Sequence, residues 1–486
     1  MERITKPMYR YDFSYWSSPV FANNDQSDDS TSVANGAEFN LRKLSPMTMF
    51  DKYYKWNHAA ATPAWVTIPL GTESMVPGRG YIVRAPQNYG ATPVPASYQP
   101  YTANFIGVPN NGIVEHAVSG ADKWNLIGNP YPSAISADAF FDANVGPGNG
   151  STNTLEGTLY LWTHNTKILP TGVPHIYSYS AADYAAYNGT GSTDTKEADS
   201  DPTPADPDDN KPTGFIAAGQ SFFIKGTASG QAVFNNAMRV AGNNSQFFRP
   251  GTSEPLNDWN MTGKHRVWLN MKGQTVGFNQ LLVGYIENAT NDWDIRFDGE
   301  SFGGNQVTFY SLLADKKLAI QGRALPFNNQ DEVPLGYKTT LNGTLTISID
   351  DYDGLFEGQD IYLEDKLLNI VHDLKAAAYS FTTVSGTFNG RFVLRYLPSE
   401  QLGNPGPVAV ADGLILYQED DKIMIKSQLQ ALEQVTIYDL LGRTLFNTAG
   451  IGQNEIRIEN VVMNEQPLIV KIRLANGQIV NKKIVY

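Results

Sequence analysis

Short runs of alternating apolar and polar residues characterise the C-terminal end of the chain. Val435, Ile437 and Leu440 are near-alternating apolar positions, which is typical of a strand with one buried face. Asn476-Gly477 separates two apolar runs, and in that setting this dipeptide is a strong hairpin signal. Residues 414–486 are therefore predicted to form an immunoglobulin-like sandwich of about seven short strands.

A similar rhythm extends through residues 251–398. The strand-like runs are 265–271, 279–286, 318–321, 343–349, 361–365, 378–383 and 390–396. Turn signals at Gly354, Gly358 and Asn389-Gly390 separate several of them. This pattern predicts a β-sandwich of the jelly-roll kind. The following segment, 399–413, is rich in proline and glycine and has the composition of a linker.

Residues 1–250 are also rich in predicted strands, and four short markers occur there twice in the same order. The markers are 16–19, 54–56, 78–84 and 103–105 in the first copy, and 127–130, 160–162, 219–225 and 232–234 in the second. We therefore expect an internal duplication, with copies at about 10–110 and 120–240, that packs as one sandwich. The alternative is that unrelated strands share these patterns by chance.

Few stretches favour a helix. The best candidate is 136–143, where Ser136 is a suitable N-cap and Asp138 lies in the first turn. A weaker candidate is 181–187, which is rich in alanine. The predicted fold class is therefore all-β, with several jelly-roll-like sandwiches followed by the C-terminal one.

Composition narrows the class of protein. The net charge is −13, and residues 414–486 hold as many acidic as basic residues, so the negative charge lies upstream. Without a basic patch, no nucleic-acid partner is expected. The chain has 0 cysteines, which excludes disulfides and thiolate chemistry. No apolar run is long enough to predict a transmembrane helix.

The first residues of the chain do not resemble a secretory signal peptide. Residues 1–6 lead directly into a strand-like stretch, without the apolar region that such a peptide requires. We therefore expect that the natural precursor is longer at its N-terminus.

Motifs for catalysis are scarce. The 6 histidines are scattered, without the spacing of a metal-binding helix. No nucleophile elbow, phosphate-binding loop or dinucleotide fingerprint occurs. A pair of carboxylates for glycoside hydrolysis would meet only in the fold, so a carbohydrate-active enzyme remains the alternative. We expect a protein that is not an enzyme.

Three acidic clusters are candidate calcium sites, because calcium prefers several oxygen ligands on loops. They are 23–29, 194–210, and the compact group of Asp292, Asp294 and Asp298 around Trp293. None has the spacing of an EF-hand. For the first two, the alternative is a solvated acidic loop. For the third, structural calcium ligands and turn-forming carboxylates are equally open.

Aromatic residues are dense in the first half of the chain. They include Tyr53, Tyr54, Trp56, Trp65, Tyr160, Trp162, Tyr177 and Tyr179. Such rings could stack on sugars, which would make the chain a module that binds surface glycans. The alternation of Tyr54 with Trp56, and of Tyr160 with Trp162, favours the other interpretation, in which they pack in a core.

The C-terminal residues resemble a known family, the type A C-terminal sorting domain of the type IX secretion system of Bacteroidetes. The matching positions are Val435, Ile437, Tyr438, Asp439, Gly442, Arg443, Lys471, Gly477, Lys482, Lys483, Ile484 and Val485. One departure is 466–468, where the family has Gly-x-Tyr. The resemblance implies recognition by the secretion translocon and its sorting and attachment machinery, and removal of this domain after export.

These observations predict a non-enzymatic secreted or cell-surface protein, exported by its C-terminal domain. After passage through the periplasm it would be anchored at the outer membrane, where its upstream domains would serve adhesion or form a stalk. The alternative is a carbohydrate-active enzyme or glycan-binding module with structural calcium.

Overall fold

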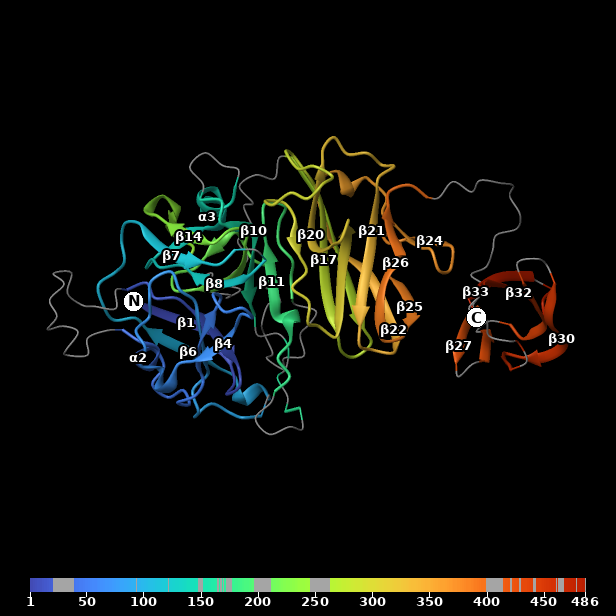
Figure 1. Ribbon diagram of the computed structural model, residues 1–486, viewed down its shortest axis with the longest axis horizontal. Coiled ribbons are helices and arrows are strands. Elements are labelled where there is room, and N and C mark those ends of the chain that lie inside the picture. Colours follow the sequence, from blue (N-terminus) through green and yellow to red (C-terminus); the bar gives the residue numbers. More distant parts are fainter. Residues whose placement is uncertain are drawn as a thin grey trace. The chain divides into compact units, whose positions relative to one another are not determined.

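The chain forms two compact units in the computed structural model, residues 1–398 and residues 399–486, and each is described by itself. The structure describes residues 1–20, 39–92, 94–120, 122–146, 152–163, 166, 168, 170–171, 177–195, 211–244, 263–398, 414–419, 422–427, 430–439, 443–459, 461, 467–477 and 479–485. The predicted linker, 399–413, lies outside the described residues. The all-β class is confirmed, since strands make up most of the described chain (Figure 1).

The first part of unit 1 contains two sets of elements. The first set is β1 (Glu2–Met8), β2 (Phe13–Trp16), α2 (Leu41–Leu44), β3 (Tyr53–Asn57), β4 (Ala64–Thr67), η1 (Pro69–Gly71), β5 (Tyr81–Arg84), η2 (Pro95–Ser97) and β6 (Gln99–Asn104). The second set is β7 (Val114–Val118), β8 (Trp124–Gly128), β9 (Ala134–Ser136), α3 (Ala137–Asn144), β10 (Leu155–Trp162), η3 (Ala181–Asp183), β11 (Tyr184–Tyr187), β12 (Phe215–Ile216), β13 (Ser221–Gly226), β14 (Gly230–Phe234), η5 (Asn236–Met238) and β15 (Arg239–Val240).

The two sets share one topology. Each has a four-stranded sheet, ordered β2-β5-β3-β4 in the first set and β8-β13-β10-β11 in the second. Each also has a two-stranded pair, β1 with β6 and β7 with β14. The first three markers of the predicted duplication lie on or at the end of equivalent strands of the two sheets, and the fourth lies on equivalent strands of the two pairs. This correspondence agrees with the duplication, which stays a prediction.

Side-chain alternation explains why these strands are buried on both faces. In β10, Leu159 and Leu161 belong to a core with helix α3, whereas Tyr160 belongs to an aromatic layer on the other face. Helix α3 begins after Ser136, whose side chain accepts a hydrogen bond from the Ala139 N–H. The predicted helix at 136–143 is confirmed. It lies beside β14 in Figure 1.

The predicted helix at 181–187 is wrong. A short turn of 3₁₀ helix, η3, is followed by strand β11, which pairs with β10. Local alanine content favours a helix, but the sheet edge of β10 offers backbone hydrogen bonds and a partly buried position for Tyr184 against the aromatic layer.

The rest of unit 1 is an 11-stranded sheet that encloses one core. Its strands are β16 (Lys264–Gly273), β17 (Phe278–Ile286), β18 (Gly299–Glu300), β19 (Val307–Leu313), β20 (Lys316–Ala324), β21 (Glu332–Thr339), β22 (Gly343–Tyr352), β23 (Tyr362–Asp365), β24 (Ile370–Asp373), β25 (Tyr379–Thr383) and β26 (Gly386–Arg395), with η6 (Gly354–Glu357). Their order is β24-β23-β26-β21-β19-β20-β17-β16-β22-β25, and β18 pairs with β20. All seven predicted strands of 251–398 correspond to observed ones.

The aromatic layer joins the two parts of unit 1. It contains Tyr15 of β2, Tyr160 of β10 and Leu282 of β17 in one buried cluster. Residues on both sides of the predicted boundary at 250 therefore share a core, and residues 1–398 form one compact unit rather than two separate bodies. The position of the predicted boundary itself lies outside the described residues.

Unit 2 is the sandwich predicted for residues 414–486. Its strands are β27 (Leu414–Glu419), β28 (Lys422–Ser427), β29 (Leu432–Tyr438), β30 (Thr444–Gln453), β31 (Glu455–Ile458), β32 (Pro467–Leu474) and β33 (Ile479–Val485). They form one sheet ordered β27-β28-β31 and another ordered β30-β29-β32-β33. Alternate residues such as Val435, Ile437 and Val470 build the core between the two sheets.

Candidate functional site

The third acidic cluster is organised by backbone hydrogen bonds. The Asp298 carboxylate accepts the N–H of Asp294 at 2.7 Å and the N–H of Gly322 at 2.9 Å. The Asp294 carboxylate accepts the N–H of Thr290 at 2.5 Å. Burial raises the pKa of Asp298 to about 7, although these two N–H groups act in the opposite direction. The geometry is that of turn-forming carboxylates.

In the part of the chain that the structure describes, Asp292, Asp294 and Asp298 do not bring their carboxylate oxygens close enough together to hold a metal ion. One other described group of three acidic side chains does. Asp292 uses its backbone N–H to contact the Thr290 hydroxyl. Of the other two clusters, 23–29 lies outside the described residues. In 194–210, Asp194 is the one acidic residue that the structure describes.

The one described group of close acidic side chains consists of Asp122, Glu156 and Glu300. The Lys225 ammonium lies among them, at 3.0 Å from Asp122, 3.8 Å from Glu156 and 2.8 Å from Glu300. Lys316 contacts Glu300 from the other side at 2.5 Å. A lysine therefore already supplies the positive charge that a metal ion would bring.

Burial makes one carboxyl group of this ion cluster a weaker acid than usual. It raises the pKa of Glu156 to about 7, against the attraction of Lys225. The cluster connects β10 and β13 of the second set with β18 and β20 of the large sheet. Its role in the structure is to attach these two parts of unit 1.

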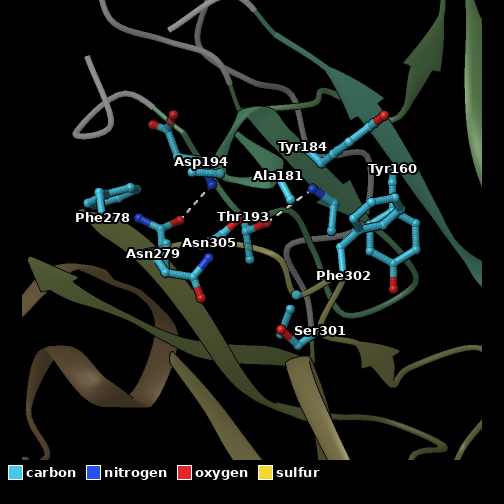
Figure 2. A pocket seen from close by; sticks show the side chains of 15 residues that line it. Tyr160, Ala181, Tyr184, Thr193, Asp194, Phe278, Asn279, Ser301, Phe302 and Asn305 are labelled. Carbon is cyan, nitrogen blue, oxygen red and sulfur yellow. Dashed lines mark hydrogen bonds between the residues drawn. The ribbon is translucent and has the colours of Figure 1, made fainter. Parts of the chain in front are cut away.

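A small cleft opens beside the aromatic layer (Figure 2). Tyr160, Tyr184 and Phe302 lie on one side of it, and Asp194 and Asn279 on the other. The Asp194 N–H donates to the Gln280 side chain at 2.7 Å, which closes the polar side. The space inside the cleft is enough for about one or two waters.

The aromatic residues named from the sequence divide into two groups. Tyr53 and Tyr160 are buried in cores, and Tyr54, Trp56 and Trp162 pack partly buried against the aromatic layer. The exposed fraction is 37% for Trp65 and 40% for Tyr179, and Tyr177 is partly buried. Most of these rings therefore pack against other side chains, and three of them, Trp65, Tyr177 and Tyr179, reach the surface.

The unit 2 residues that resemble a sorting motif close a turn between β29 and β30. The Asp439 carboxylate accepts the backbone N–H of Arg443 at 2.8 Å and its Nε–H at 2.6 Å. Asp439 is buried, whereas the Arg443 side chain is mostly exposed. Val435 and Ile437 are core residues, Tyr438 is partly buried, and Gly442 lies outside the described residues.

The rest of the motif forms the predicted hairpin. Strands β32 and β33 pair from Pro467 with Val485 to Arg473 with Ile479. Gly477 has φ +85° in the turn, which glycine adopts without strain. Lys471 is exposed and Lys482 and Ile484 are partly buried, while Lys483 and Val485 belong to β33. Strand β33 is therefore an edge strand that ends near the end of the chain.

Sequence reasoning missed the buried cations Arg84 and Lys225. Both end the third marker of the predicted duplication, so their shared position was a usable signal. Sequence reasoning also missed the environment of His58. Its Nδ1 lies 2.9 Å from the Ser119 hydroxyl, and its ring centre lies 6.3 Å from that of His116. Burial lowers the pKa of His116 to about 3. Only the fold brings these two histidines together.

Comparisons with known proteins give families without an assigned activity. The family model described as domain of unknown function DUF8693 matches residues 1–396, and that described as domain of unknown function DUF8694 matches residues 402–486. No curated protein matches the chain. No described helix is long and apolar enough to cross a membrane.

Two solved structures show weak similarity. One is titled biofilm associated protein, BSP domain; it is 10% identical, with 92% of this chain and 89% of that chain covered and a TM-score of 0.14. The other is dimeric latent PorU from Porphyromonas gingivalis, 11% identical, with 99% of this chain and 47% of that chain covered and a TM-score of 0.13. At these scores the similarities carry no argument about fold or function.

Proposed function

Because the chain belongs to the DUF8693 family, whose description assigns no activity, we propose its function from its own geometry: it is a non-enzymatic cell-surface protein. Unit 2 is the sorting domain that directs its export by a type IX secretion system. Residues 1–398 then serve as an adhesive or stalk-like body outside the cell.

One observation carries the sorting proposal. Residues 399–486 are a unit of their own, and among the described strands β33 is an outer strand of the four-stranded sheet. An edge strand exposes unpaired N–H and C=O groups, to which a strand of a partner protein can add. The motif residues support this reading, because the bonds between Asp439 and Arg443 hold the turn beside the same sheet.

The body of the protein supports a mechanical or adhesive role. The aromatic layer and the ion cluster around Lys225 both connect the first part of unit 1 to the large sheet. Such a body resists bending at that junction, which suits a stalk. The small cleft of Figure 2, with room for about one or two waters, lends no support to a catalytic role.

A localisation experiment tests the proposal. The chain is expressed behind a signal peptide in a bacterium that has a type IX secretion system, and in a strain without its translocon. We expect the full chain at the surface or in the medium of the first strain and in the periplasm of the second. Deletion of residues 476–486 should leave it in the periplasm of both strains.

The matched control replaces Lys426 with glutamine on the other sheet of unit 2 and should be exported normally. Tryptophan fluorescence of the periplasmic protein checks that unit 1 is still folded. Surface display of the chain without residues 476–486 would refute the proposal.

A further inference from the structure

Arg84 is a buried cation that forms no ion pair with any residue that the structure describes. Its exposed fraction is 6%, and its Nε–H finds no hydrogen-bond acceptor among the described residues. One terminal nitrogen lies 3.4 Å from the sulfur of Met49, which is a weak acceptor. Buried charges are normally paired, because an uncompensated one is costly.

In the second copy of the predicted duplication, the equivalent position holds a buried cation that is paired with carboxylates. Lys225 of β13 is paired with Trp124 of β8 as Arg84 of β5 is paired with Phe13 of β2, and its exposed fraction is 7%. Three carboxylates surround Lys225 within 3.8 Å. No described carboxylate forms an ion pair with Arg84, although the two cations hold equivalent places in sheets of the same order.

The surroundings of Arg84 combine aromatic rings with a second cation. The guanidinium carbon lies 5.5 Å from the centre of the Tyr11 ring, and Tyr11 stacks on Tyr177 with ring centres 4.2 Å apart. The hydrogen bond with Tyr11 raises the pKa of Tyr177, while Arg84 and Arg10 act to lower it. Both arginines therefore lie near the stacked pair, and both rings are partly exposed.

The acidic groups nearest to Arg84 are engaged elsewhere. Asp51 forms an ion pair with Lys52 at 2.6 Å, and this bond is the main reason for the lowered pKa of Asp51. Asp12 is buried and accepts the N–H of Tyr9 at 2.8 Å. One Asp51 oxygen also lacks a partner, so a water between Asp51 and Arg84 is the rival explanation to be tested.

We propose that Arg84, with Tyr11 and Tyr177 beside it, binds the carboxylate of an acidic sugar. A guanidinium offers a planar pair of donors that matches a carboxylate. The Tyr11 ring contacts both Arg84 and Tyr177, so the ring face offered to a pyranose is that of Tyr177, which is partly exposed. A single carboxylate matches the one buried guanidinium of Arg84, since Arg10 is only partly buried.

Binding by the wild-type full chain tests the proposal without any risk of misfolding. Isothermal titration would compare galacturonate, its neutral methyl ester, galactose and acetate at low ionic strength. We expect galacturonate to bind at least about tenfold more tightly than each of the other three. Equal binding of the methyl ester would overturn the role of the charge, and equal binding of acetate would overturn the role of the rings.

Substitutions locate the site. Arg84→Met should weaken galacturonate binding at least about tenfold, Arg84→Lys should weaken it less, and Tyr177→Ala should weaken galacturonate but not acetate. The control Asp51→Asn should leave binding unchanged. If Asp51→Asn lowers the melting temperature as much as Arg84→Met does and no sugar binds, the water-bridged pair is the explanation. This outcome is independent of where the chain is exported.

Discussion

Replacing Lys225 with methionine removes the cation that three carboxylates share. Its Nζ lies 2.8 Å from Glu300 and 3.8 Å from Glu156, and the exposed fraction of its side chain is 9%. Asp122 contributes little, because its side chain is 79% exposed and screened by water. Breaking a buried pair from one side costs about 3–5 kcal/mol, since the remaining charge stays buried.

Two features bring the expected loss to the lower end of that range. Lys316 still neutralises Glu300 in the variant, at 2.5 Å. Glu156, whose pKa burial already raises to about 7, can take up a proton instead of remaining charged. We therefore expect Lys225→Met to lower the free energy of unfolding by about 3 kcal/mol at pH 8, and by less at pH 5.

Urea denaturation followed by tryptophan fluorescence measures this loss. All 8 tryptophans lie in the first 300 residues, so the signal reports unit 1 within the full chain. The matched control is Lys55→Met, which breaks the pair with Glu73 in the same unit. Those side chains are 27% and 37% exposed, so the expected cost is below about 1 kcal/mol. If Lys225→Met lowers the free energy of unfolding no more than Lys55→Met does, the reasoning is refuted.

Four further predictions follow from other contacts. The folded state raises the pKa of Glu156 and of Asp298 to about 7, so the free energy of unfolding should fall as pH rises from about 4.5 to 7. Glu156→Gln should make this fall smaller, as measured by the urea concentration at the midpoint of unfolding at each pH. Gly157→Ala should cost about 1–3 kcal/mol, because its Cβ would lie 2.4 Å from the Ile295 carbonyl oxygen, whereas Gly358→Ala, which meets open space, should be neutral. Asp439→Ala should lower the stability of unit 2 by about 1–3 kcal/mol in hydrogen exchange, and the exposed Glu433→Ala should not. Adding calcium should leave the melting temperature unchanged, because Asp294 and Asp298 already accept backbone N–H groups; a rise that Asp298→Asn abolishes would contradict this.

Periodic patterns allowed the strands to be predicted where alternation was clear. The hairpin at Asn476-Gly477 and the buried positions Val435 and Ile437 follow from short-range signals alone. Strand β21 was missed because it contains Pro334 and Gly336, which normally argue against a strand. Strand β19 was missed because most of its residues are buried, so its apolar run does not alternate.

The candidate sites could not be predicted in the same way. Lys225 meets Glu156 and Glu300 only because β13, β10 and β18 come together in the fold. The three aspartates around Trp293 were a visible cluster, but their oxygens accept N–H groups of their own turn and of Gly322, which sequence spacing does not reveal. Spacing along the chain identifies acidic residues, whereas the partner of each one depends on packing.

The two copies of the predicted duplication differ in whether their buried cation is paired. Glu300, the closest partner of Lys225, comes from the large sheet rather than from the second copy itself. The first copy has no described carboxylate in that role beside Arg84, so its cation keeps a free donor next to the rings of Tyr11 and Tyr177. A buried charge is retained only where something compensates it. The same strand position thus serves attachment in the second copy and, under our proposal, recognition of an anion in the first.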